Sequence, residues 1–399
     1  MAEDEKPYRV YRGGRQKGKV PAPSLRQPGR DRRERERTRR GESAAPPAGG
    51  GIAVKILRRL GWRRSLLLAL GLFGVLLALW AISSWNAVSG GMDKANKRLP
   101  SAARRQLAPQ DGLLFSKPTT ILLLGTDSAP IKARSGDRHS DSIELLRTDP
   151  SHHRLAYLTI PRDLYVHVPG LGNTKINAAY QAGGPALALA TVHQFTGLPI
   201  NHVIIVDFSS FKELIDSLGG VTINVPSPIL SNRFDCPFKT AAACSAWPGW
   251  RFHKGRQTMD GKRALVYSRI RENLLNPRET DMARAGRQQA VLQATMANMT
   301  SFSTMLGLPW DGGSLVKPLT TDLSTTDVLQ LGWVKFRSST SSTLYCRLGG
   351  DTASTSSGSA IIPSEDNRNI LSMWTGASAP QRPTTTYGPG CAVGHTIAP

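Results

Sequence analysis

Several arginines are gathered in one short stretch in the second half of the chain, residues 268–289, together with a carboxylate and an amide. The side chains concerned are Arg269, Arg271, Arg284, Arg287, Asp281 and Gln288. A guanidinium group is planar, and it donates parallel hydrogen bonds that match two oxygens of a phosphate. A set of such groups suits a pyrophosphate ligand. The stretch alone is equally consistent with a solvated basic helix face held by ion pairs.

The spacing of these residues predicts how they are presented. Arg269 and Arg271 are two residues apart, so in an extended segment they point to the same side. Asp281, Arg284 and Gln288 follow i, i+3, i+7 spacing, which places them on one face of a helix. We therefore expect two rows of polar groups that face one another.

Two aspartates further upstream could hold a cation. Asp127 follows an apolar run at residues 119–126, and Asp141 precedes a second apolar run. Ligands of open α/β sheets collect beyond the carboxyl ends of the strands, and Mg²⁺ takes oxygen ligands from carboxylates and phosphates. Taken singly, each aspartate could instead be an ordinary turn residue.

Three more polar residues lie between the aspartates and the arginine-rich stretch. Arg162 follows Pro161 at the end of an apolar run, and Lys175 and Asn177 lie in a Gly/Asn-rich loop before a helical segment. A lone Arg or Lys in a loop is usually solvated surface, so these residues carry information only in combination with the others.

The pattern of apolar residues predicts an α/β domain. Compact apolar runs indicate strands at residues 119–126, 154–160, 202–208 and 221–225. Helical patterns occupy residues 185–195, 208–220, 286–299 and 326–336. Their alternation predicts a mostly parallel or mixed central sheet with helices on both faces, a three-layer α-β-α arrangement. We expect residues 338–359 to form a loop and the chain after about residue 379 to be a loose end.

An uncharged apolar run at residues 65–85 has the length of a membrane-spanning helix. The arginines at positions 58, 59, 63 and 64 precede it, so the positive-inside rule places the N-terminus in the cytoplasm and the rest outside. A cleaved signal peptide fits less well, because the run is too long and too far from Met1. We expect a disordered cytoplasmic tail (1–64), one span (65–85), a polar stalk (86–112), an extracytoplasmic catalytic domain (113–375) and a flexible tail (376–399).

The basic charge is concentrated before the span. The formal net charge is +22, and residues 1–64 hold 19 Lys and Arg against 7 Asp and Glu. Nucleic-acid binding would need interleaved aromatic residues or a recognisable module, and neither is visible. Contact with the anionic lipid of the bilayer explains the segment better, so we expect no nucleic-acid partner.

All four cysteines, Cys236, Cys244, Cys346 and Cys391, follow the span. An even number in an oxidising compartment indicates disulfides, and the spacings are not those of zinc sites. Of the three possible connectivities we choose the local one, Cys236–Cys244 and Cys346–Cys391.

The order of the motifs closely resembles the LytR-CpsA-Psr family, from about Leu113 to near Thr375. The motifs are GTD, SD, IPRD, TKINAAY, FSSFKELIDSLGGVTINV, MDGKRALVYSRIR and DMARAGRQQ. The resemblance implies a membrane-anchored enzyme that moves a glycopolymer from a polyprenyl-pyrophosphate lipid to peptidoglycan or another wall acceptor.

The resemblance also implies roles for single residues. Asp127 and Asp141 become the carboxylates that hold Mg²⁺, with Mn²⁺ as a possible substitute. Residues expected to take part in catalysis are Asp127, Asp141, Arg162, Arg269 and Asp281. Residues expected to bind the pyrophosphate are Arg138, Arg162, Lys175, Asn177, Arg269, Arg271, Arg284, Arg287 and Gln288.

Two positions depart from the family pattern. The family commonly has Arg two residues before the second aspartate, where this chain has His139, with Arg138 just before it. The segment between Arg271 and Asp281 is a few residues longer than usual. The first departure concerns one phosphate contact, and the second concerns the closure of the pocket rim.

The reaction expected from these residues is phosphoryl transfer, with one of the aspartates as general base. Two other functions stay open: a pyrophosphatase that uses water as the acceptor, and a non-enzymatic wall-binding or regulatory anchor. Serine hydrolase and zinc protease chemistry is disfavoured, because neither Gly-x-Ser-x-Gly nor HExxH occurs.

Overall fold

The computed structural model of the chain describes residues 62–126, 140–277, 279, 281–380 and 390–394. The chain divides after Leu68 into two units, and the fold below belongs to the second, Ala69–Pro399. The helices in the described segments are α2 (Trp62–Arg98), α3 (Ser101–Arg104), α4 (Asn177–Thr196), α5 (Phe208–Ser217), α6 (Ala241–Ala246), α7 (Gly261–Arg269), α8 (Asp281–Met299), α9 (Phe302–Val316), α10 (Thr325–Arg337) and α11 (Asn367–Thr375), with 3-10 turns η1 (Pro150–His152) and η2 (Thr340–Ser342).

A mixed sheet of seven strands forms the centre of the part that the structure describes, in the order β11-β6-β1-β2-β3-β12-β15. Its strands are β1 (Thr119–Thr126), β2 (Ser140–Asp149), β3 (Arg154–Ile160), β6 (His202–Asp207), β11 (Thr320–Thr321), β12 (Leu344–Arg347) and β15 (Cys391–Val393). The pairs β1–β6 and β3–β12 are parallel, and the other neighbours are antiparallel. The fold class expected from the sequence is confirmed.

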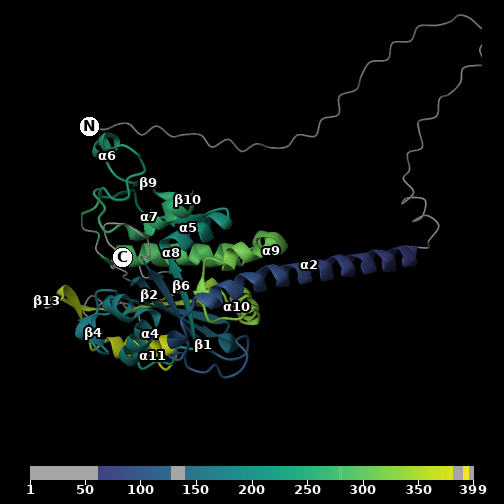
Figure 1. The fold of residues 1–399 in the computed structure, drawn as a ribbon, viewed down its shortest axis with the longest axis horizontal. Coiled ribbons are helices and arrows are strands. Elements are labelled where there is room, and N and C mark those ends of the chain that lie inside the picture. Colours follow the sequence, from purple (N-terminus) through teal and green to yellow (C-terminus); the bar gives the residue numbers. More distant parts are fainter. Residues whose placement is uncertain (1–61, 127–139, 278, 280, 381–389, 395–399) are drawn as a thin grey trace, which may run out of the picture. The chain divides into compact units, whose positions relative to one another are not determined.

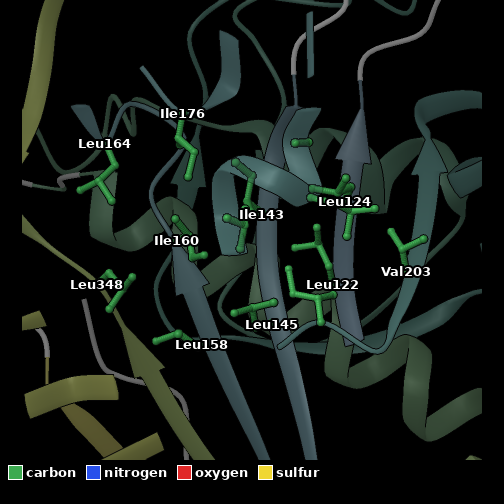
Figure 2. Packing of buried hydrophobic residues seen from close by; sticks show 14 of the residues in the cluster. Leu122, Leu124, Ile143, Leu145, Leu158, Ile160, Leu164, Ile176, Val203 and Leu348 are labelled. Atoms are coloured by element: carbon green, nitrogen blue, oxygen red, sulfur yellow. The ribbon is translucent and has the colours of Figure 1, made fainter. Parts of the chain in front are cut away.

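Helices cover both faces of this sheet (Figure 1). On one face, α3, α4 and α11 pack on leucines and isoleucines of β1, β2 and β3, and Figure 2 shows part of this core, with Leu122, Leu145 and Leu158 among the labelled residues. On the other face, α8 and α10 pack on Ile121, Leu146 and Tyr157. Alternate residues of each strand therefore enter different cores, as the strand geometry requires.

A smaller ladder stands apart from the central sheet. It pairs β7 (Val221–Val225) with β10 (Gly255–Met259), and α5, α7 and α8 surround it in a second core around Ile215, Phe252 and Tyr267. The strand predicted at residues 221–225 exists, but it does not belong to the central sheet. The remaining short strands are β4 (Tyr165–Val168), β5 (Gly172–Lys175), β8 (Ile229–Leu230), β9 (Arg251–Phe252), β13 (Gly350–Thr355) and β14 (Gly358–Pro363).

Helix α4 is longer than the helix predicted at residues 185–195, and it is kinked where that predicted helix begins. Gly183 and Gly184 have non-helical backbone angles, with φ 58° at Gly184, and Pro185 begins the second half of the helix. Glycine adopts positive φ with little strain because it has no Cβ. Proline is accepted in the first turn of a helix, because the N–H that it lacks would have no intrahelical acceptor there.

The apolar run at residues 65–85 lies in α2, which continues as one helix to Arg98. Within the described residues, this is the one helix long and apolar enough to cross a membrane. Its last turns enter the domain, because Val88 and Met92 are buried against residues of α9 and α10. The polar stalk expected at residues 86–112 is therefore wrong for its first part.

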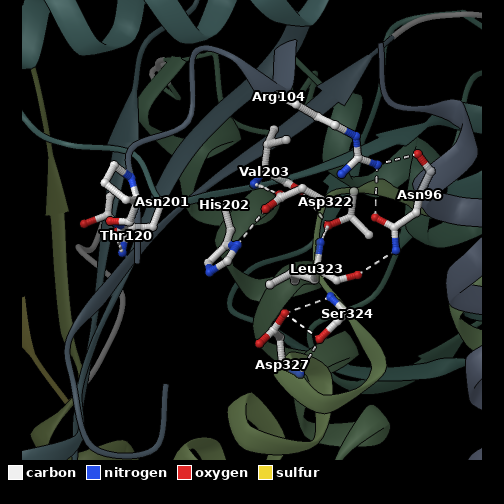
Figure 3. A network of polar contacts seen from close by, with 12 residues as sticks. Asn96, Arg104, Thr120, Asn201, His202, Val203, Asp322, Leu323, Ser324 and Asp327 are labelled. Carbon is white, nitrogen blue, oxygen red and sulfur yellow. Dashed lines mark hydrogen bonds and ion pairs between the residues drawn. The ribbon is translucent and has the colours of Figure 1, made fainter. Parts of the chain in front are cut away.

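Polar contacts also fasten the end of α2 to the domain (Figure 3). The Asn96 amide donates to the carbonyl of Leu323 at 2.8 Å, and Arg104 donates to the carbonyl of Asn96 at 2.7 Å. Next to them, the carboxylate of Asp322 accepts from the backbone N–H of Val203 at 2.8 Å and contacts Nδ1 of His202 at 2.7 Å. These bonds join α2 and the segment before α10 to strand β6.

The C-terminal part of the chain is more ordered than the sequence suggests. Residues expected to form a loop at 338–359 include β12 and β13, and β15 lies in the tail that was expected to be loose. Cys346 and Cys391 are paired across β12 and β15 and form a disulfide, and Cys236–Cys244 forms the other. Both predicted disulfides are present.

Candidate functional site

A pocket lies at the carboxyl ends of β3 and β12. Its lining residues are Ser142, Ile143, Thr159, Ile160, Pro161, Arg162, Asp163, Arg284, Gln288, Arg347 and Ile361. Arg162 is the second residue after β3, Arg284 and Gln288 come from α8, and Arg347 is the last residue of β12. The structure thus brings together three residues that were predicted from two separate motifs, Arg162 from one and Arg284 and Gln288 from the other.

Helix α8 contributes Arg284 and Gln288 to the pocket, in the arrangement that their sequence spacing predicts. Arg284 and Gln288 are four residues apart, so they lie on the same face about one turn from each other. Asp281 is the first residue of α8, and its side chain lies outside what the structure describes. The predicted helical row is confirmed for Arg284 and Gln288.

Asp163 joins two of the predicted cations. Arg162 Nε donates to Asp163 Oδ2 at 3.4 Å, and Lys175 Nζ lies 3.3 Å from Asp163 Oδ1. Lys175 is the last residue of β5, and the buried Asn177 begins α4 and donates its backbone N–H to the carbonyl of Arg162 at 3.2 Å. The structure therefore gathers Arg162, Lys175 and Asn177, with Asp163 as the residue that the sequence reasoning missed.

Arg269 lies in different surroundings from those expected. It is the last residue of helix α7 rather than part of an extended segment, and α7 begins at the N-cap Asp260. Its guanidinium forms an ion pair with Asp235 and stacks on Phe208, 4.6 Å from the ring centre. Arg269 and the exposed Arg271 are not among the lining residues of the pocket. The prediction of an extended pair of arginines is wrong, because the chain is helical up to Arg269.

Arg287 has a structural environment. It is buried, its Nη1 lies 2.9 Å from Glu279 Oε2, and its Nη2 donates to the carbonyl of Ile270 at 2.7 Å. Glu279 in turn accepts from the Asn273 amide at 2.8 Å. These contacts tie the loop after α7 to α8. The pyrophosphate contact expected of Arg287 stays a prediction, and in the structure its guanidinium holds the loop after α7 against α8.

The predicted metal carboxylates lie largely outside the described residues. This applies to Asp127, Arg138 and His139 entirely, and to the side chain of Asp141, whose backbone is the second residue of β2. The two ends of the undescribed segment, Thr126 and Ser140, are paired across β1 and β2. Among the described residues there is no group of three or more His, Cys, Asp or Glu side chains that could hold a metal ion.

A buried carboxyl group lies beneath the pocket. Glu144 of β2 faces Thr159 of β3, whose hydroxyl donates to Glu144 Oε1 at 3.4 Å and accepts from Gln289 Nε2 at 2.7 Å. Burial raises the pKa of Glu144 to about 7, although the hydrogen bonds with Thr159 and Gln289 act to lower it. Sequence reasoning missed Glu144, and the available signal was an acidic residue inside the apolar run of a strand.

The chain belongs to the LytR_cpsA_psr family, whose profile matches residues 86–347. A polyisoprenyl-teichoic acid–peptidoglycan teichoic acid transferase, TagU of Bacillus mycoides (strain KBAB4), is 31% identical over 241 residues, 59% of this chain and 71% of TagU. The regulatory protein MsrR of Staphylococcus aureus (strain COL) is 30% identical over 261 residues, 64% of this chain and 70% of MsrR.

Solved structures show the same fold. The crystal structure of Bacillus subtilis TagV has a TM-score of 0.50 and 26% identity, and the match covers 65% of this chain and 97% of TagV. A structure of TagT bound to LI-WTA also has a TM-score of 0.50, with 23% identity over 67% of this chain and 94% of TagT. The likeness to TagT concerns the fold alone.

Proposed function

We propose that this protein is a membrane-anchored phosphotransferase that moves a glycopolymer from a polyprenyl-pyrophosphate lipid to a hydroxyl group of peptidoglycan or another wall acceptor. The observation that carries the proposal is the pocket in which Arg162 and Arg284 converge with Gln288 from different elements. The similarity to TagU, which is named as a transferase of teichoic acid from a polyisoprenyl carrier to peptidoglycan, supports the same reaction class.

The pocket residues supply what phosphoryl transfer requires. An acceptor hydroxyl attacks the phosphorus that bears the polymer, a new P–O bond forms, and polyprenyl phosphate leaves with the electrons of the broken bond. The hydroxyl proton passes to a general base, for which an aspartate is the best candidate. Guanidinium groups stabilise the charge on the nonbridging oxygens, and positioning and charge neutralisation account for most of the catalysis in such reactions.

Asp127 and Asp141 are proposed to hold Mg²⁺. Support comes from the described residues beside them: Thr126 and Ser140 are paired across β1 and β2, and Ser142 of β2 lines the pocket. When bound, the cation would neutralise phosphate oxygens that carboxylates otherwise repel. We expect excess chelator to abolish transfer and added Mg²⁺ or Mn²⁺ to restore it. Full activity in chelator would mean that the arginines suffice.

The reaction products distinguish the proposal from its two alternatives. The full-length protein in lipid vesicles is incubated with a lipid-linked pyrophosphate saccharide and a peptidoglycan oligomer. Transferase activity yields a polymer–peptidoglycan conjugate, and pyrophosphatase activity yields a free sugar phosphate. Binding without turnover would identify a non-enzymatic anchor. This alternative is included because the relative MsrR is named as a regulatory protein.

Substitutions in the pocket test its role. Arg162→Ala and Arg284→Ala each remove a hydrogen-bond donor with a full charge, which is worth roughly 1.5–3 kcal/mol, or about ten- to a hundred-fold in rate. The matched control is Arg368→Ala, because Arg368 is exposed on α11 and pairs only with the equally exposed Glu365 among the ion pairs of the described residues. Near-normal transfer by both pocket variants would overturn the assignment.

A further inference from the structure

Helix α9 is packed against the membrane helix α2 through glycines. A Cβ atom at Gly91 would lie 2.5 Å from Val316 Cγ2 and 2.8 Å from the carbonyl oxygen of Gly313, and one at Gly312 would lie 2.8 Å from Val88 Cγ2. Small residues allow the two backbones to approach this closely. The two helices are therefore in direct contact and not joined by mobile side chains.

The contact extends into the apolar run of α2. Trp80 Nε1 donates to the carbonyl of Leu306 at 3.1 Å, so the first turns of α9 lie beside Trp80. Trp80 is five residues before Trp85, the end of the apolar run, and a helix rises 1.5 Å per residue. If α2 spans a membrane, the level of Leu306 is therefore roughly 7 Å inside the apolar layer.

Four apolar side chains of α9 are exposed. Phe302, Met305, Leu306 and Trp310 are 76%, 48%, 50% and 78% exposed, and their i, i+3, i+4, i+8 spacing places them on one side of the helix. We call these four residues the α9 apolar face. The one charged residue of α9, Asp311, is nine residues from Phe302 and therefore lies on the opposite side of the helix, so the α9 apolar face itself carries no charge.

We propose that the α9 apolar face is inserted into the outer leaflet of the membrane that α2 spans. Its depth follows from the contact with α2, and roughly 5–10 Å is the depth at which amphipathic helices lie at the boundary between headgroups and acyl chains. Tryptophan and other aromatic residues are enriched at that level, as Trp310 and Phe302 would be. The domain is then anchored by two neighbouring elements, α2 across the bilayer and α9 along its surface.

The proposal rests on the membrane anchoring of the proposed function, and the test separates the two. All four cysteines lie in described segments and form disulfides, so an introduced cysteine is the only thiol available to a label. Phe302→Cys and Trp310→Cys are labelled with a nitroxide in the full-length protein, which is reconstituted in vesicles of phosphatidylcholine and phosphatidylglycerol. Collisions with oxygen, which concentrates in lipid, are compared with collisions with a water-soluble nickel chelate.

Two control positions give the reference values. Leu76→Cys lies within the apolar run of α2, and Leu171→Cys lies at the turn between β4 and β5, where Leu171 is 49% exposed. We expect the oxygen-to-nickel ratio at positions 302 and 310 to be several-fold higher than at 171 and to approach that at 76. Thermal unfolding like that of the unsubstituted protein confirms that the labelled variants are folded.

The outcomes are distinct. If positions 302 and 310 behave like 171 while 76 is in lipid, the inference is wrong and the membrane span stands. If both reagents are excluded from 302 and 310, another protein surface or a second copy covers α9, which also overturns it. If 76 itself is exposed to the nickel chelate, the membrane anchoring fails first.

Discussion

At the scale of single residues, the protonation of the buried Glu144 is coupled to folding. In the unfolded chain its carboxyl ionises at the ordinary pKa of 4.5, whereas burial raises the pKa to about 7 in the folded protein. Between these values the folded state holds a proton that the unfolded state releases. The contribution of Glu144 to the free energy of unfolding therefore falls as the pH rises from about 4.5 to about 7, and it is constant above that.

The substitution Glu144→Gln tests this expectation. The amide keeps the shape of the side chain and cannot ionise, so the variant should lose this fall in stability. At pH 8 it should be more stable than the unsubstituted protein by an amount on the order of 3 kcal/mol, and near pH 4.5 the difference should vanish. Urea unfolding at the two pH values measures this, with Glu365→Gln as the control because Glu365 is exposed. Parallel pH dependences of the two proteins would show that Glu144 is not buried.

Single residues also show where sequence reasoning ends. The types of Arg162, Lys175 and Arg284 and the order of their motifs sufficed to predict a phosphate site, and the structure brings Arg162 and Arg284 into one pocket. The role of Asp163 could not be predicted, because it depends on the hairpin of β4 and β5. This hairpin pairs Lys175 with Tyr165 and so brings the Lys175 ammonium close to Asp163. The environment of Arg287 likewise depends on its ion pair with Glu279. Glu279 lies in the loop between α7 and α8, and the path of that loop could not be predicted from the sequence.

At the scale of elements, three of the four predicted strands are apolar on both faces, and the fourth, β7, alternates buried and exposed residues. β1, β3 and β6 lie inside the sheet and read as continuous apolar runs. β13 was not predicted because most of its residues are polar, and β12 and β15 were not predicted because they are short. These strands are stable because they pair with neighbours and with a disulfide partner. Propensity over a short window contains no information on such contacts.

The joint between α2 and α9 is an element-scale feature with a matched pair of glycines. A Cβ at Gly91 would meet Val316 and the backbone of Gly313, whereas at Gly90 there is nothing within 4 Å. Gly91→Ala should therefore destabilise the protein by about 1–3 kcal/mol through overpacking. Gly90→Ala should stabilise the helix by roughly 0.5–1 kcal/mol, because alanine loses less backbone entropy.

The measurement is the unfolding midpoint of the full-length variants in detergent micelles, on heating. Because the two substitutions are identical in chemistry and adjacent in one helix, their difference reports the contact and not helix propensity. Equal midpoints for Gly91→Ala and Gly90→Ala would mean that α2 leaves the domain without packing on α9. The membrane inference for α9 would then lose its depth argument.

At the scale of the whole molecule, charge and cysteines are distributed on opposite sides of the apolar run. The basic excess of residues 1–64 precedes it, and all four cysteines follow it as two disulfides. Disulfides persist in oxidising compartments and are rare in the cytosol, and basic flanks stay on the cytoplasmic side. These two independent trends favour one orientation, with the N-terminal segment inside and the pocket outside.

This orientation is the last prediction. Ser43→Cys and Leu171→Cys each add one thiol, before and after the apolar run respectively, to a chain whose own cysteines are all in disulfides. In intact cells, with any outer membrane made permeable, a membrane-impermeant maleimide should label the second variant and label the first only after lysis. Moving positive charge across the bilayer is costly, so a mixture of both orientations is not expected. Labelling of position 43 in intact cells would place the pocket in the cytoplasm, where no wall acceptor is available, and the proposed transfer reaction would have to be abandoned.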